Sequence, residues 1–181
     1  MIIGQKVVLR EKRLADAWND YTWETDLELA QLDASPILAI TFSQYLSSYA
    51  NELRYSSTTS RRFAVDTLDS KHIGNCSYYN ISESKGSTEV GIMIGNRDYW
   101  NKGWGTDTIT TLVNYIFWET KLTRIYLKTL ETNIRAQKCF QKCGFTPYDH
   151  LSRNGFSFVL MGIQHNQWQK RQAKNPGQIS I

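Results

Sequence analysis

A glycine turn near the middle of the chain has the residue types needed to bind an anion. Asp98 to Thr106 reads DYWNKGWGT and lies between an apolar run that ends at Ile94 and a long helical pattern. Gly103 and Gly105 lack Cβ atoms, so a ligand can approach the backbone, and they tolerate positive φ, so successive N–H groups can converge on one anion. The helix that follows adds unpaired N–H groups and a positive dipole end. The pattern indicates either a phosphate site or an ordinary tight turn.

Length and composition indicate one globular domain. The chain has 181 residues, of which 41% are hydrophobic and 21% charged, enough for one sizeable core. We expect a single domain over residues 1–163 and a frayed, solvated C-terminal tail over residues 164–181. No stretch approaches the roughly 18 apolar residues of a membrane span, and the N-terminus lacks the apolar core of a signal peptide. The prediction is a cytoplasmic protein with no membrane partner.

Cysteine usage argues against a disulfide framework and a metal site. The chain has three cysteines, an odd number. Cys139 and Cys143 are four residues apart on a predicted helix, and no second pair of ligands completes a zinc site. We therefore expect buried or unreactive thiols and no bound metal.

Charge is distributed unevenly along the chain. Residues 14–53 contain seven acidic residues and no Lys or Arg, and because the whole chain carries +4, the remainder carries +11. This division can attract a cationic molecule to one side and an anionic molecule to the other. Two solvated helix faces of unlike charge are the alternative interpretation. The seven acidic residues are Asp16, Asp20, Glu24, Asp26, Glu28, Asp33 and Glu52.

Hydrophobic periodicity places these features on a series of elements. It predicts a strand, two helices, three strands, a helix, a strand, a helix and two strands. The first helix runs from Leu14 toward Trp23, the second has Thr41 as its N-cap, and a later one opens at Asn133 and ends before Gly144. Because a helix over 106–119 separates two strands, those strands should be parallel. The predicted strands are 7–10, 62–68, 72–81, 88–95, 124–130, 146–151 and 156–163.

Two motifs in this order of elements resemble the GNAT N-acetyltransferase superfamily, in particular its RimJ/RimL-type branch. That branch has a Trp-x-x-Gly-x-Gly/Ala-Thr turn, present here from Trp100 to Thr106, and an Asn-x-x-Ala/Ser helix ending in Gly-Phe, present from Asn133 to Phe145. The resemblance covers about residues 4–163. It implies an α/β (α+β) fold whose mixed, mostly antiparallel seven-stranded sheet has a splayed central parallel strand pair and flanking helices. It also implies an acyltransferase that uses acetyl-CoA as the acyl donor.

The resemblance assigns the glycine turn to the pyrophosphate of acetyl-CoA. Since Trp100 stands where the wider superfamily has Gln or Arg, cofactor anchoring should depend more on backbone groups and on Lys102. Asn133 is the family's cofactor-side polar residue, and a helix N-cap is its alternative role. The backbone donors implied at the turn are those of Lys102, Gly103, Trp104, Gly105 and Thr106.

The strand before the turn is implied to bind pantetheine. Once it separates from its parallel neighbour, the backbone groups of Ile92, Met93 and Ile94 can pair with pantetheine amides like an added strand. One N–H there could also stabilise the tetrahedral oxyanion.

The implied reaction is direct attack of an amine on a thioester. An alkylammonium with a pKa near 10.4 must lose a proton first, which costs about 4.6 kcal/mol at pH 7, so a general base is useful. The family often has a Glu just before a bulge in the fourth strand, and Glu89 stands there, followed by Gly91, which would suit a bulge. Glu89 is therefore the predicted base, acting through water, with a structural carboxylate as the alternative. His72 is a weaker candidate.

The leaving thiolate has no evident proton donor. Many superfamily members use a Tyr on the last helix, but Phe140 occupies the matching position here. We expect Phe140 to pack in the core and solvent to protonate the thiolate. Tyr148 is a distant substitute.

The sequence indicates the acceptor amine less clearly than the acetyl donor. In the family, the first two helices and the final hairpin form its binding side, which here includes the acidic segment. Trp18, Tyr21, Trp23 and Tyr45 are available there for cation–π contacts or for packing. A protein N-terminal amine, a polyamine or an aminoglycoside-like amine would fit this field, and the branch name favours the first.

Other classes of function stay open at this stage. One is an acyl-CoA-binding regulatory module without turnover. A nucleic-acid binder is disfavoured, because the basic half alternates its cations with acids such as Asp107 and Glu119. We therefore predict no nucleic-acid partner and leave open whether the chain forms a homodimer.

Overall fold

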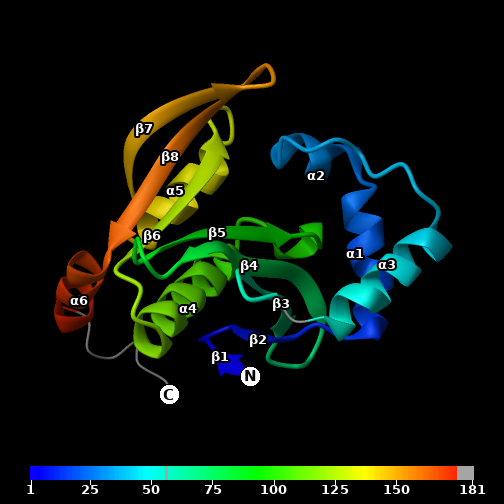
Figure 1. Ribbon diagram of the computed structural model, residues 1–181, viewed down its shortest axis with the longest axis horizontal. Helices are drawn as coiled ribbons and strands as arrows, with labels where there is room; N and C mark the ends of the chain where they lie inside the picture. The colour runs from blue at the N-terminus through cyan, green and yellow to red at the C-terminus, as the bar shows by residue number, and fades with distance from the viewer. Residues whose placement is uncertain (56, 175–181) are drawn as a thin grey trace.

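The chain folds around one eight-stranded sheet (Figure 1). The computed structural model describes residues 1–55 and 57–174. The strands lie in the order β1-β2-β3-β4-β5-β6-β8-β7, and β5 and β6 form the one parallel pair. The mixed, mostly antiparallel sheet is therefore confirmed. The strands are β1 (Ile2–Ile3), β2 (Val7–Glu11), β3 (Ser60–Thr67), β4 (His72–Ser82), β5 (Ser87–Ile94), β6 (Arg124–Leu130), β7 (Thr146–Arg153) and β8 (Phe156–Gln164).

The number of strands differs from the sequence prediction by one. β1 consists of Ile2 and Ile3, which pair antiparallel with Leu9 and Val8 of β2. Two apolar residues are too few to show an alternating pattern, so the prediction of seven strands was wrong.

The N-terminal region holds three α-helices rather than two, together at one end of the molecule (Figure 1). The extra one, α2, begins where the Asp26 carboxylate accepts a hydrogen bond from the Leu29 N–H at 3.0 Å. Thr41 caps α3 as predicted, because its hydroxyl accepts from the Gln44 N–H and the Gln44 side chain accepts from the Thr41 N–H. These helices are α1 (Ala17–Glu24), which follows the short 3₁₀ helix η1 (Leu14–Asp16), then α2 (Leu27–Leu32) and α3 (Phe42–Arg54).

Helix α4 (Trp104–Glu119) packs on the sheet through its predicted apolar stripe. Ile109, Leu112 and Ile116 are fully buried, together with Ile125 of β6. The later helix α5 (Ile134–Lys142) packs beside α4. Because the core fixes α4 against β5, the start of α4 is held close to the end of that strand.

Residues 165–174 form a helix, α6 (His165–Lys174), where a frayed tail was expected. Trp168 is buried, its ring packs against Phe117, and its indole N–H donates to the Asn114 side chain at 2.7 Å. One tryptophan in an otherwise polar segment gives no apolar period, so the sequence did not predict this helix. The remainder of the expected tail, 175–181, lies outside the described residues. The domain boundary at residue 163 stays a prediction.

Residues 1–55 and 57–174 contain neither a membrane-spanning helix nor a cluster of metal ligands. None of the helices there combines the length and the apolar character needed to cross a bilayer. No group of three or more His, Cys, Asp or Glu side chains there could hold a metal ion.

A buried ion network fastens the first helices to the sheet. The Arg10 guanidinium of β2 donates to the Asp16 carboxylate at 2.8 Å and to the Asp66 carboxylate of β3 at 2.6 Å. All three residues are buried. Burial alone would raise the pKa of Asp16, but the hydrogen bonds from Arg10 and from the Arg13 N–H outweigh it and lower that pKa. The network holds η1, and with it the start of α1, against β2 and β3.

Asp16→Asn should destabilise the fold by about 3 kcal/mol at pH 7, because it leaves a buried guanidinium short of one charged partner. The folded-state pKa of Asp16 lies below its unfolded value of about 3.9, so this stabilisation is present above that pH and is lost as pH falls through the folded pKa. Urea unfolding at pH 7 and at acid pH measures it, with Glu83→Gln in the exposed β4–β5 loop as control. A loss of stability that stays constant into the acid range would contradict this role.

Candidate active site

The parallel strands β5 and β6 separate partway along their length. Their pairing covers Ser87 to Glu89 of β5 against Arg124 to Tyr126 of β6. Beyond it, β5 stays paired with β4 as far as Ile94, while β6 pairs only with β8. The β5 edge that faces β6 is therefore unpaired over its last residues, as expected for a splayed pair.

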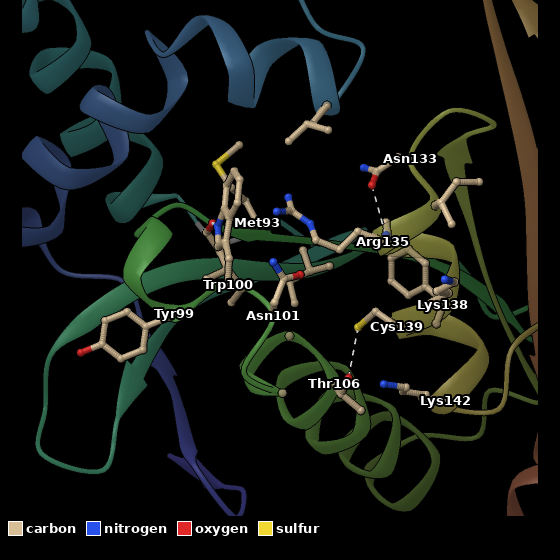
Figure 2. A pocket seen from close by; sticks show the side chains of 18 of the residues that line it. Met93, Tyr99, Trp100, Asn101, Thr106, Asn133, Arg135, Lys138, Cys139 and Lys142 are labelled. Atoms are coloured by element: carbon tan, nitrogen blue, oxygen red, sulfur yellow. Dashed lines mark hydrogen bonds between the residues drawn. The ribbon is translucent and has the colours of Figure 1, made fainter.

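A cavity of about 530 Å³, cavity A, opens at this separation between β5, the glycine turn and α5 (Figure 2). Most of the predicted cofactor residues line it, but Lys102 and Trp104 do not. The Lys102 ammonium donates to the Asp98 carbonyl at 2.7 Å, and the Trp104 ring packs edge-on against Tyr99. The predicted residues that line cavity A are Ile92, Met93, Ile94, Gly103, Gly105, Thr106 and Asn133.

The two glycines of the turn have different roles. Gly103 has φ of +85° and is the N-cap of α4, which begins at Trp104. No side chain in the described part of the chain caps this helix, so its first N–H groups are available to an anion. Gly105 lies within α4 and does not have positive φ, so of the two glycines only Gly103 adopts the left-handed conformation that both tolerate. A Cβ at Gly105 would have room 3.6 Å from the Cys139 sulfur, on the wall of cavity A.

Trp100 fastens the turn to the strand before it. Its indole N–H donates to the Ile94 carbonyl. That carbonyl already has a partner, so the backbone groups predicted to pair with pantetheine are those of Ile92 and Met93 and the N–H of Ile94.

Asn133 is the N-cap of α5 and lies on the wall of cavity A. Its side-chain oxygen accepts from the Ala136 N–H at 3.1 Å. The alternative role weighed for this residue, a helix cap, is therefore confirmed. Its place on the cavity wall leaves the cofactor role as a prediction.

Three cations of α5 line cavity A, and the sequence analysis missed them (Figure 2). The Arg135 guanidinium lies over the Trp100 ring, 3.7 Å from its centroid. Desolvation lowers the pKa of Arg135, while Lys138 and Lys142 follow along the same helix and are exposed. Their spacing of three and four residues after a predicted helix start could have revealed them, because such residues share one helix face. They provide the positive charge that the prediction gave to Lys102.

Glu89 lies where β5 and β6 separate. It does not line cavity A, nor does it line the second cavity, cavity B, on the side of α1–α3. It is 5% exposed, and its carboxylate accepts from the Tyr79 hydroxyl, the Asn80 amide and the Lys128 ammonium at 3.0–3.1 Å. Burial first, and then the Glu89 charge, raise the pKa of Tyr79. The base role of Glu89 stays a prediction, and Tyr79 is its link to the neighbouring cavity.

The expected bulge at Gly91 is absent. Gly91 pairs regularly with Ser77, and the irregularity lies in β4 between Tyr79 and Ser82. Asn80 has φ of +52° there. The Asn80 amide, which donates to Glu89, lies in this distorted part of β4. The prediction therefore assigned the bulge to β5, whereas it lies in β4.

A second cavity of about 600 Å³, cavity B, lies on the side of α1–α3. Of the aromatic residues predicted for the acceptor side, Trp23 and Tyr45 line it. Trp18 and Tyr21 do not; they pack against Phe42, with ring centroids 4.8 and 5.3 Å away. Its charged lining residues are the acids Asp20, Glu24, Asp33 and Glu52 and the bases Lys12 and Arg62.

Hydrogen bonds fix the acids of cavity B in place. The buried Asp20 carboxylate accepts from the Tyr49 hydroxyl at 2.8 Å and the Asn75 amide at 2.7 Å, and it pairs with Lys12. Glu24 accepts from the Tyr45 hydroxyl at 2.9 Å, and burial raises its pKa. Desolvation lowers the pKa of Lys12. Four carboxylates against two basic side chains give cavity B an excess of acidic groups.

Cavities A and B share one wall. Asp33, Ile92 and Met93 line both of them. An anionic ligand with its phosphates at the glycine turn and a cationic ligand in cavity B would therefore meet at the unpaired edge of β5.

The remaining candidates lie apart from this shared wall. Phe140 is buried and packs on Phe145, which confirms its predicted packing role. Tyr148 is exposed under the Arg124 guanidinium, and His72 packs against Trp23. Tyr148 and His72 line neither cavity.

Comparison with known proteins agrees with this geometry. Residues 6–146 match the family profile described as "Acetyltransferase (GNAT) domain", and the chain belongs to that family. It is therefore an acyltransferase that takes its acetyl group from acetyl-CoA. The uncapped start of α4 at the glycine turn, the α5 cations and the unpaired edge of β5 fit that cofactor.

Individual relatives are distant. The chain is 23% identical over 142 residues to an uncharacterized N-acetyltransferase, p20, from Bacillus licheniformis, covering 78% of this chain and 79% of that protein. A spermidine N-acetyltransferase from Vibrio cholerae, solved with CoA and spermine, superposes with a TM-score of 0.80 at 21% identity over 90% of this chain and 98% of that one. An aminoglycoside acetyltransferase solved with coenzyme A gives 0.76 at 18% identity, over 92% and 99%. The structural matches show that the fold is shared.

Replacing each glycine of the turn by alanine should separate folding from binding. Gly105→Ala should keep or slightly raise stability, because alanine favours a helix by up to about 1 kcal/mol, yet weaken acetyl-CoA binding about tenfold by placing a methyl group on the wall of cavity A. Gly103→Ala should lose about 1 kcal/mol or more of stability, because its φ is left-handed. Thermal unfolding and calorimetric titration with acetyl-CoA measure both. An unchanged affinity of Gly105→Ala for acetyl-CoA would refute the assignment of Gly105 to the cofactor site.

Glu89→Gln should lower turnover while leaving acetyl-CoA affinity nearly unchanged. The substitution removes the negative charge that Tyr79 and Lys128 contact, whereas Glu89 itself lines neither cavity. Steady-state rates and a separate calorimetric titration with acetyl-CoA distinguish the two effects. Full activity in this variant would leave Glu89 a purely structural carboxylate.

Proposed function

We propose that the enzyme acetylates a primary amine of a small polycationic molecule of the polyamine or aminoglycoside class. The observation that carries the proposal is the acidic, aromatic cavity B, which meets the cofactor cavity at Asp33 and Met93. A cavity of this kind suits an alkylammonium through charge and cation–π contacts. Two proteins with similar folds are named as acetyltransferases of spermidine and of aminoglycosides.

The protein N-terminal amine that the branch name favoured has no support in these comparisons. Assignment to the RimJ/RimL-type branch and a cytoplasmic location also stay predictions, and whether the chain forms a homodimer stays open. The branch assignment depends on the turn from Trp100 to Thr106 and on the helix that opens at Asn133.

Acetyl-CoA would be held from two sides of cavity A. The free N–H groups after Gly103, with Lys138 and Lys142, would bind its phosphates. The unpaired edge of β5 at Ile92 and Met93 would pair with the pantetheine amides. The bound cofactor supplies an acetyl group activated as a thioester.

The chain's own groups then orient the amine and stabilise the reaction. Cavity B holds further positive charges of the acceptor, so its reacting nitrogen is directed toward the shared wall. A backbone N–H on the unpaired β5 edge would stabilise the oxyanion that develops on the thioester carbonyl. Solvent protonates the CoA thiolate, because Phe140 occupies the position where many superfamily members have a tyrosine.

Thiol release from acetyl-CoA should occur with spermidine, spermine or an aminoglycoside and not with N-terminal peptides that lack other amines. Glu24→Gln should raise the KM for the accepted amine about tenfold, equivalent to about 1.4 kcal/mol, with the KM for acetyl-CoA unchanged. Glu83→Gln, in the exposed β4–β5 loop, is the matched control. Turnover of peptides with none of the polycations would overturn the proposal.

A further inference from the structure

Asp33 stands where the two cavities meet. It lines both, as do Ile92 and Met93, and of these three residues it alone has an ionisable side chain. It is also the one carboxylate among the described residues that line cavity A. A group at this wall can reach an amine in cavity B at the place where a thioester along β5 would present its carbonyl carbon.

The other acids near the reaction path already have partners. Glu89 is buried under three donors and lines neither cavity, and the Asp20 carboxylate is bound by Tyr49, Asn75 and Lys12. Glu52 pairs with Arg62. Glu24 accepts from Tyr45 and lines cavity B alone, away from the shared wall.

The end of α2 fixes the backbone of Asp33. Its N–H donates to the Leu29 carbonyl at 3.0 Å, and Ala34 follows with φ of +52°, which turns the chain away from the helix. Because the backbone is held, any reorientation of Asp33 involves its side chain. This side chain is exposed to solvent on the cavity wall.

Three neighbouring side chains act on the Asp33 carboxylate. Desolvation raises its pKa, while the Ser35 hydroxyl next to it and the Lys128 ammonium of β6 oppose the rise. The Tyr79 hydroxyl of β4 is close enough for Asp33 to contribute to its raised pKa. A carboxylate with a raised pKa accepts a proton more readily than an ordinary one.

We propose that Asp33 is the general base that deprotonates the acceptor amine. This role rests on the proposed function. The Asp33 carboxylate takes one proton from the ammonium, and the nitrogen lone pair then forms the C–N bond to the thioester carbonyl carbon. As the C–S bond breaks, the second nitrogen proton goes through solvent to the CoA thiolate. Asp33 afterwards releases its proton to water, so the ammonium and acetyl-CoA give the amide, CoA with a free thiol and one proton.

The test compares Asp33→Asn with the wild-type chain across pH 6–10, using spermidine and thiol release. Asp33→Asn should lower kcat/KM about 100-fold or more at pH 7, with acetyl-CoA affinity by calorimetry within about twofold. Without a base, only the free amine reacts, so the deficit should shrink about tenfold per pH unit toward the amine pKa near 10.4. A general loss of structure would not produce this dependence. Asp69→Asn, in the exposed β3–β4 turn, should behave like the wild-type chain.

Each alternative result has a defined meaning. An active wild-type chain with an equally active Asp33→Asn variant would overturn the role of Asp33 alone. A pH-dependent deficit in Glu89→Gln, but not in Asp33→Asn, would also overturn it and make Glu89 the base. A wild-type chain that binds acetyl-CoA but acetylates neither spermidine nor an aminoglycoside would overturn the proposed function and the role of Asp33 with it.

Discussion

The site depends on the loss of pairing between β5 and β6 after Glu89 and Tyr126. A strand edge inside a protein normally has its N–H and C=O groups paired, because unpaired ones are costly to bury. Here the edge is left open over the last residues of β5. The fold tolerates this because α4 holds β5 from one face and β4 pairs its other edge. The open edge contributes Ile92 and Met93 to the wall that cavities A and B share.

The two cavities on either side of that wall differ in the charge of their lining residues. Helix α5 brings Arg135, Lys138 and Lys142 to cavity A, while α1 and α3 bring acids to cavity B. In the proposed function, this division would attract an anionic cofactor and a cationic acceptor to opposite sides of one strand. Asp33 lies where the two fields meet. The buried ion pairs of Arg10 with Asp16 and Asp66 hold the start of α1, which contributes acids to cavity B, against the sheet.

Much of the fold was predictable because its signals are local. The apolar stripe of α4, the Thr41 cap and the antiparallel hairpins each depend on residues close in sequence, and these predictions hold. The misses have a common cause: β1, α2 and α6 are short or polar segments. Tertiary contacts such as that of Trp168 with Asn114 stabilise them, and such contacts leave no periodic pattern.

The sequence by itself determined the acetyltransferase family, its acetyl-CoA donor and the position of the glycine turn, because the motifs that carry them consist of glycines and helix boundaries a few residues apart. Only the tertiary structure decided which side chains face the reactants. It turned Lys102 toward Asp98, surrounded Glu89 with three donors, and placed Asp33 on the wall between the cavities. Those outcomes depend on strands and helices distant in the chain, whose relative placement is set by packing of the whole core and not by local spacing.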